Sequence, residues 1–160
     1  MKKGFYLSLL IMLSFSLMST TCSSDDDDVS PNDNSQQIAQ IENTVESGTW
    51  RITNFNDSGQ NETSDFNGYD FSFNSDGSLV ATNGSNSVTG TWSVTNDSNS
   101  SDDNSSDDID FNIFFPVPDD HDFEDLNDDW DVVTTTSTRI ELIDISGGNG
   151  DTDLLTFERN

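Results

Sequence analysis

The spacing of apolar residues changes once along this 160-residue chain, near residue 48. In residues 35–46 the apolar side chains recur at Ile38, Ile41 and Val45, which is the i, i+3, i+7 spacing of an amphipathic helix. Gly48 follows them, and glycine is typical of the position just past a helix end. We therefore predict a short helix here, with its apolar stripe packed against the segments that follow.

From residue 49 onward, apolar and polar residues alternate in short segments, which is the period of half-buried β-strands. Tyr69, Phe71 and Phe73 form one such segment, and the Ser-Asp-Gly sequence at 75–77 then favours a hairpin turn. Counted in this way, the chain holds about eight strands in sequential order. A meander that closes into an up-and-down barrel is the simplest arrangement, because closure removes exposed strand edges.

Aromatic residues occupy most of the inward positions of this predicted barrel. In an eight-stranded barrel such side chains either fill the interior or line a pocket for one small apolar ligand. Phe55 and Phe114 fall outside the inward phase, and we expect them to pack against the helices. The residues predicted to form the interior, or to line such a pocket, are Trp50, Tyr69, Phe71, Phe73, Trp92, Phe111 and Phe115.

Two irregular segments are predicted in the second half of the domain. Residues 119–129 follow a Pro-Val-Pro stop and are expected to form one or two helical turns before the last three strands, with Phe123 and Leu126 pointing inward. In residues 139–145 the apolar phase shifts after Leu142, which indicates a β-bulge. The sequence Gly-Gly-Asn-Gly at 147–150 then favours a turn into the final strand.

The N-terminal segment is unlike the rest of the chain. Two lysines precede an apolar run of about 13 residues, which is too short to span a bilayer as a helix and fits a secretory signal peptide. Small residues then lead into Cys22, the only cysteine. This arrangement resembles the lipobox of bacterial lipoproteins, which implies that residues 1–21 are removed and Cys22 is lipidated. Cleavage of an ordinary signal peptide nearby is the alternative.

Residues 22–34 are polar and acidic, with four consecutive aspartates, and are predicted to form a flexible tether. An acidic run beside the anchor resembles the export signal that places lipoproteins of Bacteroidota on the outer face of the outer membrane. The resemblance implies an outer-membrane protein that faces the cell exterior. A solvated spacer is the alternative interpretation, and the two are compatible.

The charge excludes some partners. The chain has 31 Asp and Glu against 5 Lys and Arg, a formal net charge of −26, and loss of the two lysines with residues 1–21 would take it to −28. Such a chain repels nucleic-acid phosphates and anionic membrane surfaces. We therefore expect no nucleic-acid partner, a membrane contact made only through the lipid on Cys22, and a monomer.

Candidate chemistry is sparse. The single histidine, His121, lies among acids without a surrounding Ser/His/Asp motif, so we expect no catalytic residues, no cofactor and no enzyme activity. The acidic segments 97–108 and 119–129 offer oxygen ligands for weak Ca²⁺ binding, but the first lacks the glycine and closing glutamate of an EF-hand loop. Solvated acidic surfaces are the favoured interpretation, with no metal site.

Residues 35–160 resemble a known family. Gly48-Thr49-Trp50 after a short helix is similar to the Gly-x-Trp element of lipocalins, and segments 68–73, 90–93 and 155–159 are similar to lipocalin-like domains of flavobacterial lipoproteins. The resemblance implies an eight-stranded barrel in which Arg159 packs on Trp50. It favours a non-enzymatic protein that binds a small apolar ligand or a surface component through the barrel mouth. A structural or interaction protein with a fully packed barrel is the alternative.

Overall fold

The computed structural model describes residues 34–97, 108–145 and 152–160. The predicted signal peptide, Cys22 and nearly all of the predicted tether lie outside these residues. The acidic loop within 97–108 and the turn at 147–150 also lie outside them. Among the described residues, no helix combines the length and apolar character needed to cross a bilayer.

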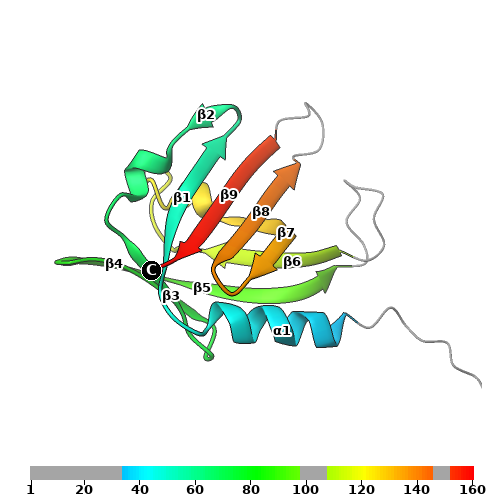
Figure 1. Cartoon of the computed structure of the whole chain (residues 1–160). Coiled ribbons are helices and arrows are strands. Elements are labelled where there is room, and N and C mark those ends of the chain that lie inside the picture. Colours follow the sequence, from blue (N-terminus) through cyan, green and yellow to red (C-terminus); the bar gives the residue numbers. More distant parts are fainter. Residues whose placement is uncertain (1–33, 98–107, 146–151) are drawn as a thin grey trace, which may run out of the picture. The chain divides into compact units, whose positions relative to one another are not determined.

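Strands dominate the described residues (Figure 1). The helix α1 (Ser35–Val45) comes first, and two short 3₁₀ helices, η1 (Thr63–Phe66) and η2 (Glu124–Leu126), interrupt the strands. The strands are β1 (Trp50–Asp57), β2 (Gln60–Asn61), β3 (Asp70–Phe73), β4 (Ser78–Asn83), β5 (Asn86–Asp97), β6 (Asp108–Phe114), β7 (Asp128–Thr136), β8 (Arg139–Ile145) and β9 (Thr152–Arg159).

The strands form a closed antiparallel barrel of eight. Their order is β1-β3-β4-β5-β6-β7-β8-β9, and β9 pairs back with β1, so that Trp50 lies between Phe71 of β3 and Arg159 of β9. The two-residue strand β2 pairs with the end of β1 outside this ring. The predicted all-β, up-and-down, eight-stranded barrel is therefore confirmed.

The helix α1 packs on the barrel as its apolar spacing predicts. Ile41 and Val45 are buried in the same core as the strand residues, and Ile38 packs against that core. The Trp50 indole N–H donates a 2.8 Å hydrogen bond to the Val45 carbonyl oxygen, which links the helix end to β1. Figure 1 shows α1 running beside β5.

Phe55 and Phe114 differ from the sequence prediction in opposite ways. The register of β1 against β9 shifts between Ile52 and Asn54. This irregularity turns the Phe55 side chain inward, and it is buried against Phe66 and Trp130. Phe114 does lie outside the inward phase, but it is 55% exposed instead of packed against a helix. An alternation count cannot place a residue beyond a bulge, because the bulge inverts the phase.

The bulge predicted in residues 139–145 is wrong. β8 pairs with β9 without a break from Arg139 to Ile145, and the irregularity lies in the neighbouring strand β7, between Val132 and Thr134. Ile145 is 47% exposed on regular β8. An apolar residue on the outer face of a strand imitates a phase shift when only the sequence is considered.

The helical segment predicted at 119–129 is much shorter in the structure. It contains the three-residue helix η2, and β7 already begins at Asp128. Asp128 and Asp129 pair with β6, so the sheet takes the last residues of the segment. Phe123 and Leu126 are buried, as the sequence predicts.

Candidate functional site

The barrel interior is the first candidate site, and the structure places its predicted lining residues as follows. Six of the seven are buried, and the seventh, Tyr69, is partly buried just before β3. The Tyr69 ring packs edge-on against Phe123 with ring centroids 5.0 Å apart. The six buried residues are Trp50, Phe71, Phe73, Trp92, Phe111 and Phe115.

Aromatic rings in direct contact occupy this interior. Phe123, from the segment between β6 and β7, lies 4.9 Å from Phe115 and 6.0 Å from Phe71 by ring centroids. Phe71 lies 5.3 Å from Phe157 of β9, which in turn lies 5.5 Å from Phe73. These spacings are those of packed aromatic pairs, so the rings pack directly against one another across the interior.

Gly48, Trp50 and Arg159 form a contact at the junction of the first and last strands. The Arg159 guanidinium carbon lies 5.8 Å from the Trp50 ring centroid. The guanidinium also donates hydrogen bonds to Ser47 Oγ at 3.2 Å and to the Ser137 carbonyl oxygen at 3.1 Å. The packing of Arg159 on Trp50 that the family resemblance implies is therefore present, and it closes the barrel instead of forming a ligand site.

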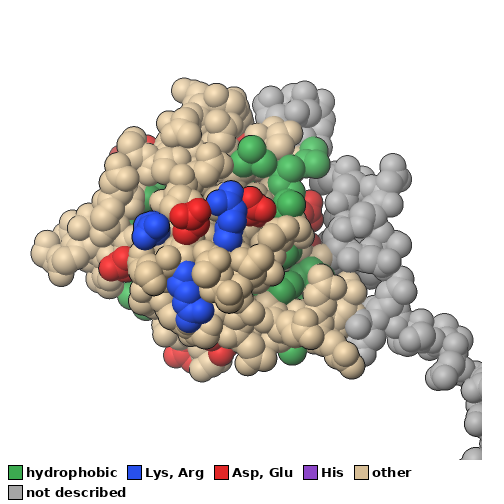
Figure 2. Space-filling model, viewed as in Figure 1, with side chains coloured by type: hydrophobic (Ala, Val, Ile, Leu, Met, Phe, Trp, Pro, Cys, Tyr) green, Lys and Arg blue, Asp and Glu red, His purple; other side chains and the backbone are tan. Residues whose placement is uncertain are grey.

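The three arginines of the described residues lie on the adjacent strands β1, β8 and β9. On the outer surface Arg139 pairs with Glu141 at 2.7 Å and with Glu158 at 2.9 Å, and Arg51 lies 3.6 Å from Glu158. Figure 2 shows these charged groups gathered over the three strands, with apolar side chains beside them. Because Arg51 and Arg139 are paired with carboxylates and Arg159 lies over Trp50, this face offers little positive charge to an anionic ligand.

Carboxylates with altered ionisation lie elsewhere on the barrel. Burial raises the pKa of Asp128 to about 7, and a hydrogen bond with the Asp129 side chain and repulsion from Asp144 add to the effect. Partial burial, followed by repulsion from neighbouring carboxylates, also raises the pKa values of Glu62 and Asp125. Among the described residues, however, no three Asp, Glu, His or Cys side chains are grouped so as to hold a metal ion.

His121 is exposed, and its ring contributes to a local turn. Its Nδ1 accepts a 3.2 Å hydrogen bond from the Phe123 backbone N–H, and the two rings lie 5.6 Å apart. Serving as a hydrogen-bond acceptor at the base of a turn is a structural task. The geometry therefore supplies no partner arrangement for acid–base chemistry at this residue.

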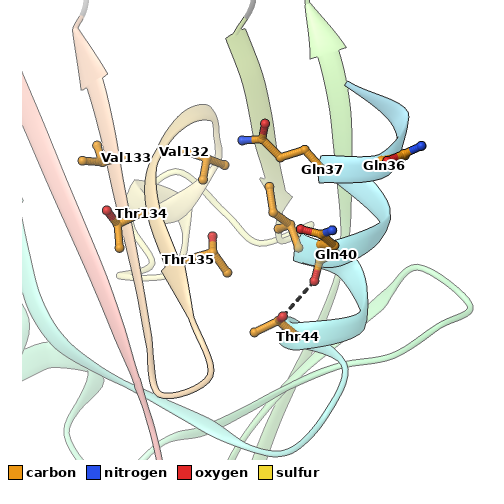
Figure 3. A pocket seen from close by; sticks show the side chains of 9 residues that line it. Gln36, Gln37, Gln40, Thr44, Val132, Val133, Thr134 and Thr135 are labelled. Atoms are coloured by element: carbon orange, nitrogen blue, oxygen red, sulfur yellow. Dashed lines mark hydrogen bonds between the residues drawn. The ribbon is translucent and has the colours of Figure 1, made fainter. Parts of the chain in front are cut away.

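A groove between α1 and β7 is the second candidate site. Its volume is about 480 Å³, within the range of ligand-binding pockets. Figure 3 shows Gln37 directed from α1 toward β7, and Val132 and Thr135 directed from β7 toward α1. The full lining comprises Gln36, Gln37, Gln40, Ile41, Thr44, Val132, Val133, Thr134 and Thr135.

This groove was not predicted from the sequence. Its helix residues are the polar face of an amphipathic helix, which ordinarily contacts solvent. Its strand residues come from a Val/Thr-rich strand whose irregularity has no signature in the residue pattern. A glutamine-rich helix face beside a Val/Thr strand is the only available signal, and it does not tell which strand the helix adjoins.

Two further grooves lined by described residues lie on the outside of the barrel. One, of about 490 Å³, runs over β8 and β9 and includes Val133, Ile143 and Leu154. The other, of about 350 Å³, lies over β5 and β6 beside the exposed ring of Phe114. Unlike the groove at α1, both include acidic or basic side chains.

Comparisons with known proteins add a structural likeness. No family model matches the chain, and no curated protein matches it. Among solved structures it is similar to a DUF4847 family protein from Bacteroides vulgatus, with 16% sequence identity, coverage of 75% of this chain and 97% of that chain, and a TM-score of 0.45. A likeness at this level says nothing about activity or ligand.

Proposed function

We propose that this protein is a lipid-anchored, non-enzymatic interaction protein whose packed barrel binds its partner on the outside. The observation that carries the proposal is the interior filled by contacting aromatic rings, among them Phe73, Phe123 and Phe157. A core packed in this way makes a rigid scaffold. A small apolar ligand would have to displace these rings at a cost of several kcal/mol.

The anchor is the second part of the proposal. A lipid on Cys22, followed by the acidic tether, would hold the barrel at the outer membrane, facing the cell exterior. The net charge of −26 supports this arrangement, because the domain is repelled from anionic lipid surfaces and needs a covalent anchor to stay at one. The same charge supports the absence of a nucleic-acid partner and a monomeric state.

Labelling of expressing cells with an alkyne fatty acid tests the anchor. The wild-type chain should take up the label and Cys22→Ala should not, whereas the neighbouring variant Ser23→Ala should be labelled like the wild type. Label that persists in Cys22→Ala would contradict the anchor. Protease treatment of intact cells tests the location, because an outward-facing barrel is degraded and an inward-facing one is protected.

Native mass spectrometry of protein purified from its own cells tests the packed interior. The expected spectrum shows a monomer without a bound small molecule. A retained apolar ligand would show instead that the interior opens, and it would favour the barrel-mouth binding that the sequence suggested.

A further inference from the structure

The strand β7 has two halves with different neighbours. Its ladder with β6 runs from Asp128 to Asp131 and extends no further among the described residues. Its ladder with β8 continues through Val132 to Thr136. Among the described residues, the second half of β7 therefore pairs with β8 only, and in this region α1 adjoins it across the 480 Å³ groove.

The groove reaches the backbone edge of β7. Four consecutive residues of this strand, Val132 to Thr135, line it. Val132 and Thr135 project toward α1 and Val133 and Thr134 project away from it (Figure 3). Side chains on opposite faces of a strand line one groove only when that groove opens onto the strand edge, where backbone N–H and C=O groups are presented.

The groove is electrically neutral in a strongly acidic protein. None of its nine lining residues is charged, although the chain carries 31 acidic residues. The lining combines amides at Gln37 and Gln40 with the apolar side chains of Ile41 and Val132. Such a lining both donates and accepts hydrogen bonds and also accommodates small apolar groups.

A buried hydroxyl lacks a partner in this groove. Thr135 Oγ1 is buried and makes no hydrogen bond within the part of the chain that the structure describes. A buried hydroxyl without a hydrogen bond lowers the stability of the folded protein, and a ligand that forms this bond recovers the lost free energy. The Thr135 side chain lines the groove, but its Oγ1 is shielded in this conformation, so a bound ligand reaches it only after the side chain changes rotamer.

We propose that the groove binds an extended peptide segment of a partner protein, which pairs with the edge of β7 that no described strand occupies. The proposal rests on the proposed function, since it identifies the partner of an outward-facing interaction protein. Backbone pairing to β7 provides affinity, the amides of α1 contact the opposite side of the peptide, and the Thr135 hydroxyl bonds to it from the β7 side. Four strand residues span about 13 Å, which accommodates a peptide segment of similar length.

Two observations define the peptide further. The groove has no aromatic lining, which disfavours a saccharide, because sugar rings are commonly stacked on aromatic faces. The net charge of −26 repels acidic segments and attracts basic ones. The partner segment is therefore an uncharged or basic peptide with β-forming residues at its centre.

Selection from a displayed library of random nine-residue peptides on the purified full-length chain tests the proposal. We expect enrichment of uncharged or basic sequences that lose binding when alternate backbone amides are N-methylated. Thr135→Val should weaken the selected peptides about tenfold, the effect of one hydrogen bond. It should leave the fold at least as stable, since it removes an unsatisfied hydroxyl.

The double variant Gln37→Ala with Gln40→Ala should weaken binding at least as much, and Gln60→Ala on β2 is the matched glutamine control. No enrichment, or selected peptides that bind all variants equally, would overturn the proposal. Binding of the same chain to neutral sugars on a glycan array, lost in Thr135→Val, would also overturn it. Failure here leaves the fatty-acid labelling of Cys22 unaffected, so the two proposals fail separately.

Discussion

Arg159, the penultimate residue, lies over the ring of Trp50, the first residue of β1, with 5.8 Å between the guanidinium carbon and the ring centroid. The two strands that they occupy are the first and last of the barrel, and they pair directly. A cation–π contact with Trp50 and hydrogen bonds to Ser47 and Ser137 therefore stabilise the pairing of β1 with β9 that closes the barrel. The contact is a structural one, and its energy is measurable.

Replacing this arginine should destabilise the barrel. Arg159→Ala removes the contact with Trp50 and both hydrogen bonds, so we expect a loss of about 1–3 kcal/mol in the free energy of unfolding, measured in urea. Arg51→Ala is the control, because Arg51 makes an exposed pair with Glu158 and a long, exposed hydrogen bond to Asn160 Oδ1, and its loss should cost less than about 1 kcal/mol. Equal losses in the two variants would show that the contact with Trp50 contributes nothing.

The absence of a side chain at Gly48 leaves room for the Arg159 guanidinium. Its φ is +144°, and a Cβ at this residue would lie 2.8 Å from Arg159 Nε. Gly48→Ala should therefore cost about 1–3 kcal/mol through backbone strain, and more through displacement of Arg159. Gly59→Ala is the control, because its φ is also positive, +84°, but no atom lies within 4 Å of the added Cβ.

A double-mutant cycle separates the cost of backbone strain at Gly48 from the cost of displacing Arg159. In the Arg159→Ala background, Gly48→Ala should cost less than in the wild type, because the side chain it displaces is gone. An unchanged cost would assign the whole effect to backbone strain.

Phe123 joins several rings of the core. It is 1% exposed and contacts Phe66, Phe71 and Phe115, so Phe123→Ala should cost about 3–5 kcal/mol of unfolding free energy. Phe114→Ala removes the same side chain from a position that is 55% exposed and should cost much less. A small loss for Phe123→Ala would mean that the interior is loosely packed, which would favour a ligand cavity.

Asp128 should make stability depend on pH. Its pKa in the folded protein is about 7, above the ordinary value near 4, so the folded state holds a proton that the unfolded state has released at intermediate pH. Its contribution to stability is complete below about pH 4 and is lost as the pH rises through 7. Stability measured by urea unfolding should fall over this range.

The variant Asp128→Asn isolates this effect. It keeps an oxygen acceptor for the Asp129 backbone N–H but cannot ionise, so it should exceed the wild type in stability at pH 8 and match it near pH 4. Asp119→Asn, at an exposed carboxylate of the preceding segment, is the matched control variant. A parallel pH dependence in wild type and Asp128→Asn would assign the slope to other acids.

The fold was largely predictable because its signals are local. The spacing of Ile38, Ile41 and Val45 indicated the helix, and the alternation of Tyr69, Phe71 and Phe73 indicated a strand. Hairpin turns between sequential strands favour antiparallel neighbours, so strand order followed from connectivity. The contact of Arg159 with Trp50 was anticipated through the family resemblance.

The prediction of strand phase failed in two situations, at an irregular strand and at a regular strand that carries an apolar residue on its outer face. Phe55 follows a register shift in β1, and Ile145 lies on the outer face of regular β8, so a count of alternating residues misplaced the bulge. The phase of a strand depends on how it pairs with its neighbours, and pairing is a long-range property that a single segment does not encode.

The candidate groove depended on tertiary structure altogether. Gln40 and Thr135 are 95 positions apart and belong to a helix face and a strand that each appear unremarkable alone. The sequence by itself determined the secondary structure, the strand order and the strongly negative charge, because these depend on local period, turn chemistry and composition. Only the tertiary structure decided that aromatic rings fill the interior and that β7 leaves β6 and meets α1, because packing and strand separation depend on all the segments together.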